Sequence, residues 1–284
     1  KISRCMTQEQ SKKALVVEGG AMRGIFAAGV LDGFLETGQT NFDFAIGVSA
    51  GSTNLIGFLA GDHGRNRKIL LQHALQPEFL NWRRFLKGGH FCDVSWLWHA
   101  SFEQVPLNTR HYLEQNRPLY VVTTNVDTGF PVYTRVTADN LHELFPASCA
   151  IPLAYREFPA VGGAPMTDGG LGDSIPVIKA YEMGARDITV ILSRPRGFRK
   201  KIRPLPKFTK RFFKHHPALF DAVARRSAVY NDAINFIDNP PADCKMTILA
   251  PPEDFPVGRF TQDKKLLEQG YEMGRAAALA TSSA

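Results

Sequence analysis

The sequence has few cysteines, and their spacing excludes the common cysteine-based sites. The four are Cys5, Cys92, Cys149 and Cys244. They lie far apart in the chain, with neither a CxxC pair nor any spacing typical of metal ligands. We therefore expect free thiols in a reducing compartment, with no structural disulfide and no metal site.

Long apolar runs are also lacking. No uninterrupted apolar stretch is long enough to span a bilayer, and residues 1–13 have no apolar centre of the kind that a secretory signal requires. The 284 residues are 44% hydrophobic and 21% charged, which suffices to bury a full core in one large domain, or in one domain with an extension. We expect a cytoplasmic protein, either free or associated with a membrane surface. Whether a leader precedes Lys1 is left open.

The most informative stretch is DFAIGVSAGS at residues 43–52, an apolar strand that runs into Ser49. Glycines stand two positions before and two positions after this serine. The pattern predicts a nucleophile elbow, a sharp strand-to-helix turn that lifts the serine Oγ clear of the sheet. A helix expected over residues 52–60 would place its N-terminal dipole beside Ser49. Short GxSxG strings also arise by chance, and an ordinary strand-to-helix turn is the alternative.

A glycine-rich turn, GGAMRG at residues 19–24, comes earlier, between an expected strand at 14–18 and a helix over 25–35. Such a turn leaves backbone N–H groups free to bind an anion. Its spacing does not fit GxGxxG, and no GK[ST] follows for a P-loop. In a right-handed strand-helix-strand unit, this turn and the elbow leave the sheet at the same edge. We therefore favour an oxyanion hole over a nucleotide site; alternatively, the glycines only allow close helix packing.

Three short motifs occur in the order EGGAMRG at residues 18–24, GVSAG at 47–51 and TDGG at 167–170. Together they resemble the bacterial branch of the patatin-like phospholipase family, in which the corresponding motifs follow the same order. The segment PASCAIP at residues 146–152 is similar to the block before that family's DGG motif. The resemblance covers roughly residues 14–195.

This resemblance implies a catalytic dyad without a metal or other cofactor. Ser49 would be the nucleophile, and Asp168 would complete the two-residue dyad. Glycines accompany both of them in the elbow and in the DGG motif. These glycines are Gly47, Gly51, Gly169 and Gly170.

The resemblance also assigns the oxyanion hole to the glycine-rich loop. The loop residues are Gly19, Gly20, Ala21, Arg23 and Gly24. The family usually has a third glycine where Ala21 stands. Alanine keeps the N–H donor but disfavours a positive φ, so the donor geometry is affected while the role is kept. Arg23 is expected to support the loop through charge-assisted hydrogen bonds.

The chemistry of the dyad can be examined without the family. A serine hydroxyl needs a partner that accepts its proton, and the usual partner is histidine. None of the eight histidines lies on a loop after a late strand and downstream of an acid, where an α/β-hydrolase has its histidine. Asp168, on a glycine-flanked loop, is the better candidate base. A turn or helix-cap aspartate is the structural alternative.

The remaining pattern predicts an α/β fold. Apolar strands at residues 119–124, 132–136 and 188–192 alternate with helical segments, which argues for a mainly parallel sheet covered on both faces. We expect a three-layer α/β/α sandwich of patatin-like type. Its catalytic domain would cover residues 14–195, and residues 196–284 would form a basic segment and a C-terminal extension packed on the same domain.

Two segments have unusual composition. Residues 77–98 contain all three tryptophans with basic residues, which suits either a lipid interface or pocket mouth, or an aromatic subcore. Residues 194–214 contain ten Lys or Arg and no Asp or Glu, although the chain's net charge is only +7. This run could contact an anionic membrane or be a solvated loop. No recognised nucleic-acid motif accompanies it, so no nucleic-acid partner is expected.

These observations together predict a lipid acyl hydrolase, of phospholipase A or carboxylic ester hydrolase type, that forms an acyl-enzyme on Ser49. Its partners would be a phospholipid or other acyl ester and, at the periphery, an anionic membrane. Two alternatives remain open: a serine–histidine esterase acting on soluble esters, and a non-catalytic lipid-binding protein. The motifs leave head group, chain length, the ester position cut, hydrolysis versus transacylation, oligomeric state and biological role undetermined.

Overall fold

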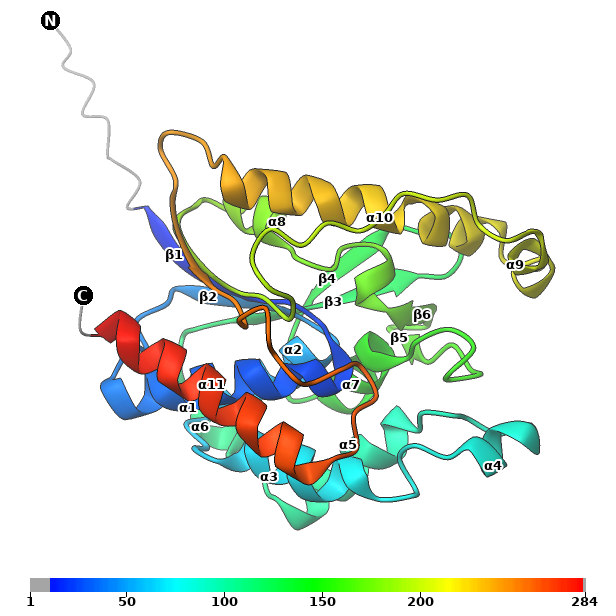
Figure 1. The fold of residues 1–284 in the computed structure, drawn as a ribbon, viewed down its shortest axis with the longest axis horizontal. Helices are drawn as coiled ribbons and strands as arrows, with labels where there is room; N and C mark the ends of the chain where they lie inside the picture. Colours follow the sequence, from blue (N-terminus) through cyan, green and yellow to red (C-terminus); the bar gives the residue numbers. More distant parts are fainter. Residues whose placement is uncertain (1–10, 283–284) are drawn as a thin grey trace, which may run out of the picture.

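The computed structural model describes residues 11–282, which form three layers around a central sheet (Figure 1). Within this range the sheet has eight strands in the order β5-β6-β3-β2-β1-β7-β8, with β4 paired to β3. The strands are β1 Lys12–Val17, β2 Phe44–Val48, β3 Leu119–Asn125, β4 Pro131–Arg135, β5 Ala160–Val161, β6 Ala164–Asp168, β7 Ala185–Ile191 and β8 Lys245–Leu249.

Five adjacent strands, from β3 through β2, β1 and β7 to β8, are parallel to one another. Strands β4, β5 and β6 form an antiparallel edge beside β3. The mainly parallel sheet predicted from the sequence is therefore confirmed. One local prediction was wrong: Asp168 is the last residue of β6 instead of a loop residue, because β6 hydrogen-bonds to β3 up to this position.

Helices cover both faces of the sheet. Helices α8 and α10 lie on one face, and α1, α2, α7 and α11 lie on the other (Figure 1). The longer ones are α1 Gly24–Thr37, α2 Ala50–Leu59, α3 Arg65–Gln72, α5 Val94–Gln104, α7 Leu141–Cys149, α10 Pro217–Asp238 and α11 Lys264–Ser282. The shorter ones are α4 Trp82–Leu86, α6 Thr109–Glu114, α8 Val177–Glu182 and α9 Lys207–Phe212. Short 3-10 turns lie at Ala21–Arg23, His73–Leu75 and Gly169–Leu171.

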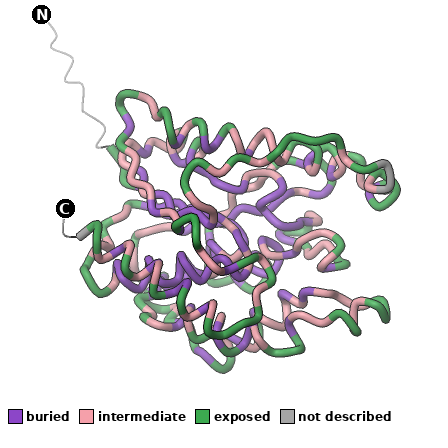
Figure 2. Tube along the Cα trace, viewed as in Figure 1, coloured by how far each residue is buried: buried purple, intermediate pink, exposed green. Residues whose placement is uncertain are grey.

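The apolar core is divided by the sheet into two layers. In β1, Leu15 and Val17 belong to the cluster beneath α1 and α2, whereas Ala14 and Val16 belong to the cluster beneath α8 and α10. This alternation follows from the two-residue period of a strand. All four side chains are fully buried. Figure 2 shows the same division, with buried segments concentrated along the sheet and on the inner sides of the helices.

The C-terminal elements share this core. Strand β8 pairs with β7, and α11 packs closely along α1. A Cβ on Gly29 of α1 would lie 2.0 Å from the carbonyl oxygen of Tyr271, and the Tyr271 hydroxyl donates to Asp32 over 2.8 Å. Only glycine permits so close a contact between two helix backbones. Loss of α11 would therefore expose the outer face of α1.

Two further sequence expectations concern membrane spans and cysteines. Within the described part of the chain, no helix is both long and apolar enough to cross a bilayer. Cys92, Cys149 and Cys244 are free thiols. Cys5 lies outside the described residues.

Candidate active site

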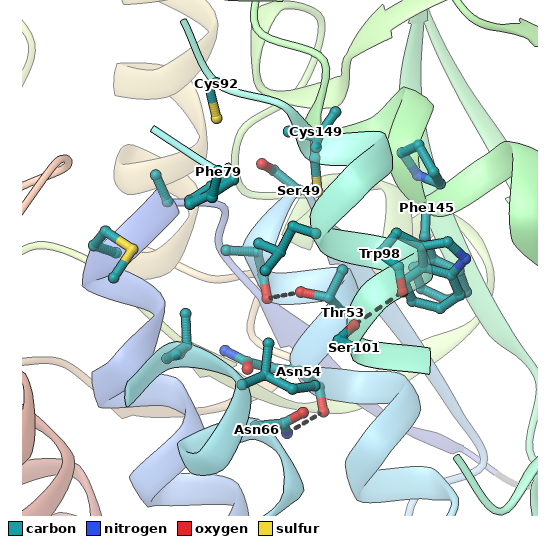
Figure 3. Close-up of a pocket in the computed structure, with 18 of the residues that line it drawn as sticks. Ser49, Thr53, Asn54, Asn66, Phe79, Cys92, Trp98, Ser101, Phe145 and Cys149 are labelled. Atoms are coloured by element: carbon teal, nitrogen blue, oxygen red, sulfur yellow. Dashed lines mark hydrogen bonds between the residues drawn. The ribbon is translucent and has the colours of Figure 1, made fainter. Parts of the chain in front are cut away.

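Ser49 lies at the turn between β2 and α2, as the sequence predicts. Its φ of 51° and ψ of −127° are uncommon for a residue with a side chain. The backbone is held on both sides: its N–H donates to Ser148 Oγ over 2.8 Å, and its carbonyl accepts from the N–H of Ser52 over 2.9 Å. The strained turn places Ser49 in the wall of a cavity, beside Cys149 (Figure 3). Such strain persists where surrounding contacts determine the conformation.

The elbow glycines are required by close contacts. A Cβ on Gly47 would lie 2.6 Å from Ser52 Cα, and a Cβ on Gly51 would lie 2.4 Å from the carbonyl oxygen of Val17. Both distances are shorter than any tolerable contact, so larger residues would displace α2 from the sheet. The two glycines therefore fix the position of Ser49 through the packing of its neighbours.

The register of the sheet brings Asp168 beside Ser49 although 118 residues separate them. Val48 pairs with Val122 of β3, and the next residue, Thr123, pairs with Asp168 of β6. Ser49 and Asp168 therefore end up on either side of β3 at the same level of the sheet. Asp168 is 8% exposed, lines the same cavity as Ser49, and lies close enough for the Ser49 hydroxyl to lower the pKa of its carboxyl.

Opposing effects act on the pKa of Asp168. Burial raises this pKa above its ordinary value, and it is the largest effect. The positive charge of Arg226, the N–H of Gly170 and the Ser49 hydroxyl lower it. The Gly170 N–H donates to Asp168 Oδ1 over 2.7 Å, and a Cβ on Gly170 would lie only 2.9 Å from this oxygen. The DGG motif therefore orients the carboxylate and leaves no room for a side chain beside it.

The glycine-rich turn after β1 also lies against Ser49. A Cβ on Gly19 would lie 3.1 Å from Ser49 Cβ, which shows how closely the two turns approach. Three N–H groups of the turn already have acceptors: Met22 donates to the carbonyl of Arg259, Arg23 to that of Gly20, and Gly24 to that of Ala21. Across residues 11–282, no acceptor is found for the N–H groups of Gly20 and Ala21. Both residues line the cavity that contains Ser49 and Asp168.

The buried side chains of Arg23 and Glu18 hold this turn through hydrogen bonds with Ser193. The Arg23 guanidinium donates to Ser193 Oγ over 3.3 Å, and the Ser193 N–H donates to Glu18 Oε2 over 2.6 Å. Burial and the neighbouring Arg194 lower the pKa of Arg23 to about 10, so the side chain stays charged at neutral pH. Burial raises the pKa of Glu18.

Ala21 has a φ of 49°, a conformation that favours glycine. We expect Ala21→Gly to stabilise the protein by about 0.5–1 kcal/mol, because relief of left-handed strain exceeds the added freedom of the unfolded chain. The N–H donor is unchanged, so activity should stay within about threefold of the parent. The matched change Ala276→Gly, in α11, should destabilise by about 1 kcal/mol. Thermal unfolding measures both, and equal losses would contradict the strain at Ala21.

An apolar cavity opens beside Ser49, between α2, α3, α5 and α7 (Figure 3). Phe79 and Trp98 line it and are 7% and 5% exposed, whereas Trp82 is 64% exposed. The aromatic segment at residues 77–98 is therefore divided between a buried cavity wall and an exposed tip. The sequence left open a lipid interface or pocket mouth on the one hand and an aromatic subcore on the other; the structure shows buried rings in the cavity wall and an exposed Trp82. The remaining apolar lining comes mainly from Met22, Ile69, Leu70, Val94, Leu97 and Phe145.

A second cavity meets the first at Ser49 and is polar. It contains Asp168 and several basic side chains, including Arg194 and Lys200 from the basic segment at residues 194–214. Two of its basic residues, Arg226 in α10 and Arg259 before α11, carried no recognisable signal in the sequence. They are found only because α10 and the C-terminal segment pack over this edge of the sheet.

No histidine belongs to the described lining of either cavity. The sulfur of Cys149 does lie beside Ser49, but burial raises the pKa of this thiol, and a protonated thiol is a poor nucleophile. Within residues 11–282, no group of three or more His, Cys, Asp or Glu is arranged to hold a metal ion. The titratable partner within reach of Ser49 is therefore Asp168.

Sequence reasoning missed Ser148, which orients the elbow. Its hydroxyl accepts from the Ser49 N–H and donates to the carbonyl of Val122 over 2.6 Å, so it links α7, β2 and β3. The only available signal was its place in PASCAIP, a segment that is similar to the family's block before the DGG motif but to which the sequence assigned no function.

Comparison with known proteins agrees with this geometry. The family model described as patatin-like phospholipase matches residues 15–181, and a model described as a domain of unknown function matches residues 216–283. An uncharacterized Escherichia coli K12 protein, YjjU, is 32% identical over 270 residues, which cover 92% of this chain and 74% of that protein.

Two solved structures match this chain over most of its length. VipD from Legionella pneumophila matches with a TM-score of 0.51 at 12% identity, covering 96% of this chain and 67% of that one. Human GIVD cytosolic phospholipase A2 matches with a TM-score of 0.47 at 12% identity, over 96% and 58%. The match to VipD supports the predicted three-layer fold. The matches in sequence also show the family. The chain belongs to the patatin-like phospholipase family.

Proposed function

We propose that the protein hydrolyses lipid acyl esters through a covalent acyl-enzyme on Ser49. Membership of the patatin-like phospholipase family supports a lipid hydrolase. The observation that carries the finer proposal is the placement of Ser49 beside the buried Asp168, at the point where an apolar and a polar cavity meet. An acyl ester has an apolar chain on one side of its carbonyl and a polar alcohol on the other, which suits this pair of cavities.

In acylation, Asp168 takes the proton of the Ser49 hydroxyl while Oγ attacks the ester carbonyl carbon. The carbonyl oxygen becomes an oxyanion, and we assign its stabilisation to the N–H groups of Gly20 and Ala21, which have no other acceptor in the described chain. The dipole of α2, which begins at Ala50, favours the same negative charge. Collapse of the intermediate breaks the ester C–O bond, and protonated Asp168 gives its proton to the departing alkoxide.

In deacylation, the same groups act in reverse order. Asp168 takes a proton from a water molecule, whose oxygen attacks the acyl carbonyl carbon, and the two N–H groups again hold the oxyanion. The carboxylic acid then leaves as the proton returns from Asp168 to Ser49 Oγ. The raised pKa of Asp168 makes it a stronger base than an ordinary aspartate, which suits a dyad without histidine.

The direct test is turnover of a panel of aryl esters and phospholipids by the parent, Ser49→Ala and Asp168→Asn. Loss of turnover in both variants, with folding intact, supports the dyad. A serine–histidine esterase is the less favoured alternative, because no described residue that lines either cavity is a histidine.

Two projecting helices, the apolar α4 and the basic α9, support contact with a membrane surface. Helices α4 and α9 project from the same side of the molecule (Figure 1). In α4, Trp82 and Leu86 are 64% and 81% exposed, and such apolar side chains on a projecting helix can enter a lipid interface. Exposed cations on and before α9, such as Arg203 and Lys210, would attract anionic head groups.

We expect the double change Trp82→Ser/Leu86→Ser to weaken binding to phosphatidylcholine–phosphatidylglycerol vesicles by about tenfold or more, because two apolar side chains no longer leave water. Vesicle sedimentation measures this affinity. Leu113→Ser is the matched control, since Leu113 is 46% exposed on α6, away from α4 (Figure 1). Equal losses in both variants would contradict docking through α4.

A further inference from the structure

The polar cavity beside Ser49 gathers positive charge from segments that are distant in the chain. Its five basic side chains are Arg23, Arg194, Lys200, Arg226 and Arg259. The same cavity contains only two carboxyl groups, those of Glu18 and Asp168. With every group ionised, the described lining has an excess of three positive charges. A half-enclosed site of this kind favours an anionic ligand.

The cations are not neutralised by ion pairs. In the described chain, no carboxylate oxygen lies within 4.0 Å of a side-chain nitrogen of any of the five. Burial is the largest effect that lowers the pKa of Lys200 to about 7; the charges of Arg226 and Arg259 also lower it, and Glu18 opposes them. Cations held together at this cost are typical of binding sites and not of structural ion pairs.

Two buried donors in this cavity have no partner. The Tyr230 hydroxyl belongs to a side chain that is 1% exposed, and Arg23 Nε belongs to one that is 5% exposed. Among residues 11–282, neither atom finds a hydrogen-bond partner. Both residues line the cavity, and Lys200 Nζ lies 4.0 Å from the centroid of the Tyr230 ring. Buried polar atoms are seldom left unsatisfied, so these donors point to a missing acceptor.

We propose that this cavity binds the phosphate group of a phosphate-bearing acyl ester whose carbonyl lies at Ser49. The inference rests on the proposed function for its lipid part. A phosphate offers several charged oxygen acceptors, which match guanidinium and hydroxyl donors arranged around one space. Ala21, Ser49 and Ile151 line both cavities, so one molecule can place its acyl chain in the apolar cavity and its phosphate in the polar one.

The anion site is tested first without catalysis. Binding of glycerol 3-phosphate, inorganic phosphate and glycerol to the Ser49→Ala protein is measured by calorimetry. We expect glycerol 3-phosphate to bind and glycerol not to bind. The double change Lys200→Met/Arg259→Gln should weaken binding of glycerol 3-phosphate by about 10- to 100-fold. The charge-matched control Arg110→Gln/Lys265→Met removes two exposed cations outside the cavity and should retain the affinity.

The pH dependence gives a second readout. Lys200 faces Glu18, Arg23, Arg226 and Arg259, and its charge is lost as the pH rises through about 7. Affinity for glycerol 3-phosphate should therefore fall as the pH rises from about 6.5 to about 8, because Lys200 loses its charge over this range. In Lys200→Met this fall should be absent. A fall of the same size in the variant would show that Lys200 does not contact the anion.

The source of the phosphate is tested with two substrates that share one acyl chain, a lysophosphatidate and a monoacylglycerol. We expect the parent to prefer the lysophosphatidate in kcat/KM by about tenfold or more, and Lys200→Met/Arg259→Gln to reduce this ratio toward one. Equal rates for both substrates, or inorganic phosphate binding as tightly as glycerol 3-phosphate, would overturn the head-group assignment.

The two proposals fail in different ways. If the parent hydrolyses no ester but Ser49→Ala still binds glycerol 3-phosphate through Lys200 and Arg259, the proposed function fails while the anion site stands. If esters are hydrolysed and no phosphate compound binds, the hydrolase stands and the anion site is overturned.

Discussion

Replacing Ser49 by alanine is expected to lower ester turnover by at least about 10³-fold, because the change removes the oxygen that we propose forms the acyl-enzyme. The change removes one oxygen atom and keeps the backbone turn, which is held by Ser148 and Ser52. The melting temperature should therefore stay close to that of the parent. Turnover of an aryl ester gives the rate, and mass spectrometry after a fluorophosphonate probe shows whether residue 49 carries the adduct.

Ser101→Ala provides the matched control for this experiment. Ser101 lines the same apolar cavity, but its hydroxyl donates to the carbonyl of Trp98 and has no partner that could accept a catalytic proton (Figure 3). We expect its activity to stay within a few-fold of the parent. Turnover retained by Ser49→Ala would rule out the acyl-enzyme at this residue. An inert parent that still binds vesicles would favour the non-catalytic lipid-binding alternative.

Asp168→Asn should have a comparably large effect, also about 10³-fold or more in kcat, because the amide cannot accept the Ser49 proton. The amide oxygen can still accept from the Gly170 N–H, so the local geometry is preserved. Asp173→Asn is the matched control: Asp173 is another carboxylate whose pKa burial raises, but it accepts from Tyr133 and lies outside both cavities at Ser49. An equal loss in both variants would indicate a structural effect.

The pKa of Asp168 also gives the sign of two pH effects. Because burial raises this pKa, the proposed base becomes protonated, and kcat/KM should fall, at a higher pH than for an ordinary aspartate. For stability the sign is reversed: the folded state holds the proton more tightly than the unfolded state. Ionised Asp168 therefore destabilises the fold at a pH above its folded pKa.

It follows that Asp168→Asn should raise the melting temperature relative to the parent at pH 8. This difference should shrink as the pH falls through the raised pKa and the parent carboxyl becomes neutral. Thermal unfolding of both proteins across this pH range measures the effect. A lower melting temperature for the variant at pH 8 would mean that Arg226 and Gly170 stabilise the carboxylate more than burial destabilises it.

Much of the fold was predictable because its determinants are local. The strand before Ser49 and the strand at residues 188–192 are short apolar runs bounded by glycine or polar residues, and this pattern is typical of buried parallel strands. The elbow was predictable for the same reason, since Gly47 and Gly51 stand beside the serine in the chain. The end of a strand was less predictable: Asp168 follows a glycine-rich turn, yet pairing with β3 includes it in β6.

The composition of the cavities depended on tertiary packing. Composition alone could not divide residues 77–98 into a buried wall and an exposed tip, because burial depends on which helices cover each side chain. The basic stretch at residues 194–214 was likewise divided, with Lys200 facing the cavity and Arg199 paired with Asp238 on the surface.

The sequence by itself therefore determined the fold class, the turn that presents Ser49 and the candidate partner Asp168. Each of these follows from a short pattern of residues that are near neighbours in the chain. Only the tertiary structure decided which side chains surround that pair. Sheet register sets Asp168 beside Ser49, and the packing of α10 and the segment before α11 brings Arg226 and Arg259 over the same edge. Contacts between residues far apart in sequence leave no local pattern, so their chemistry emerges only when the chain is folded.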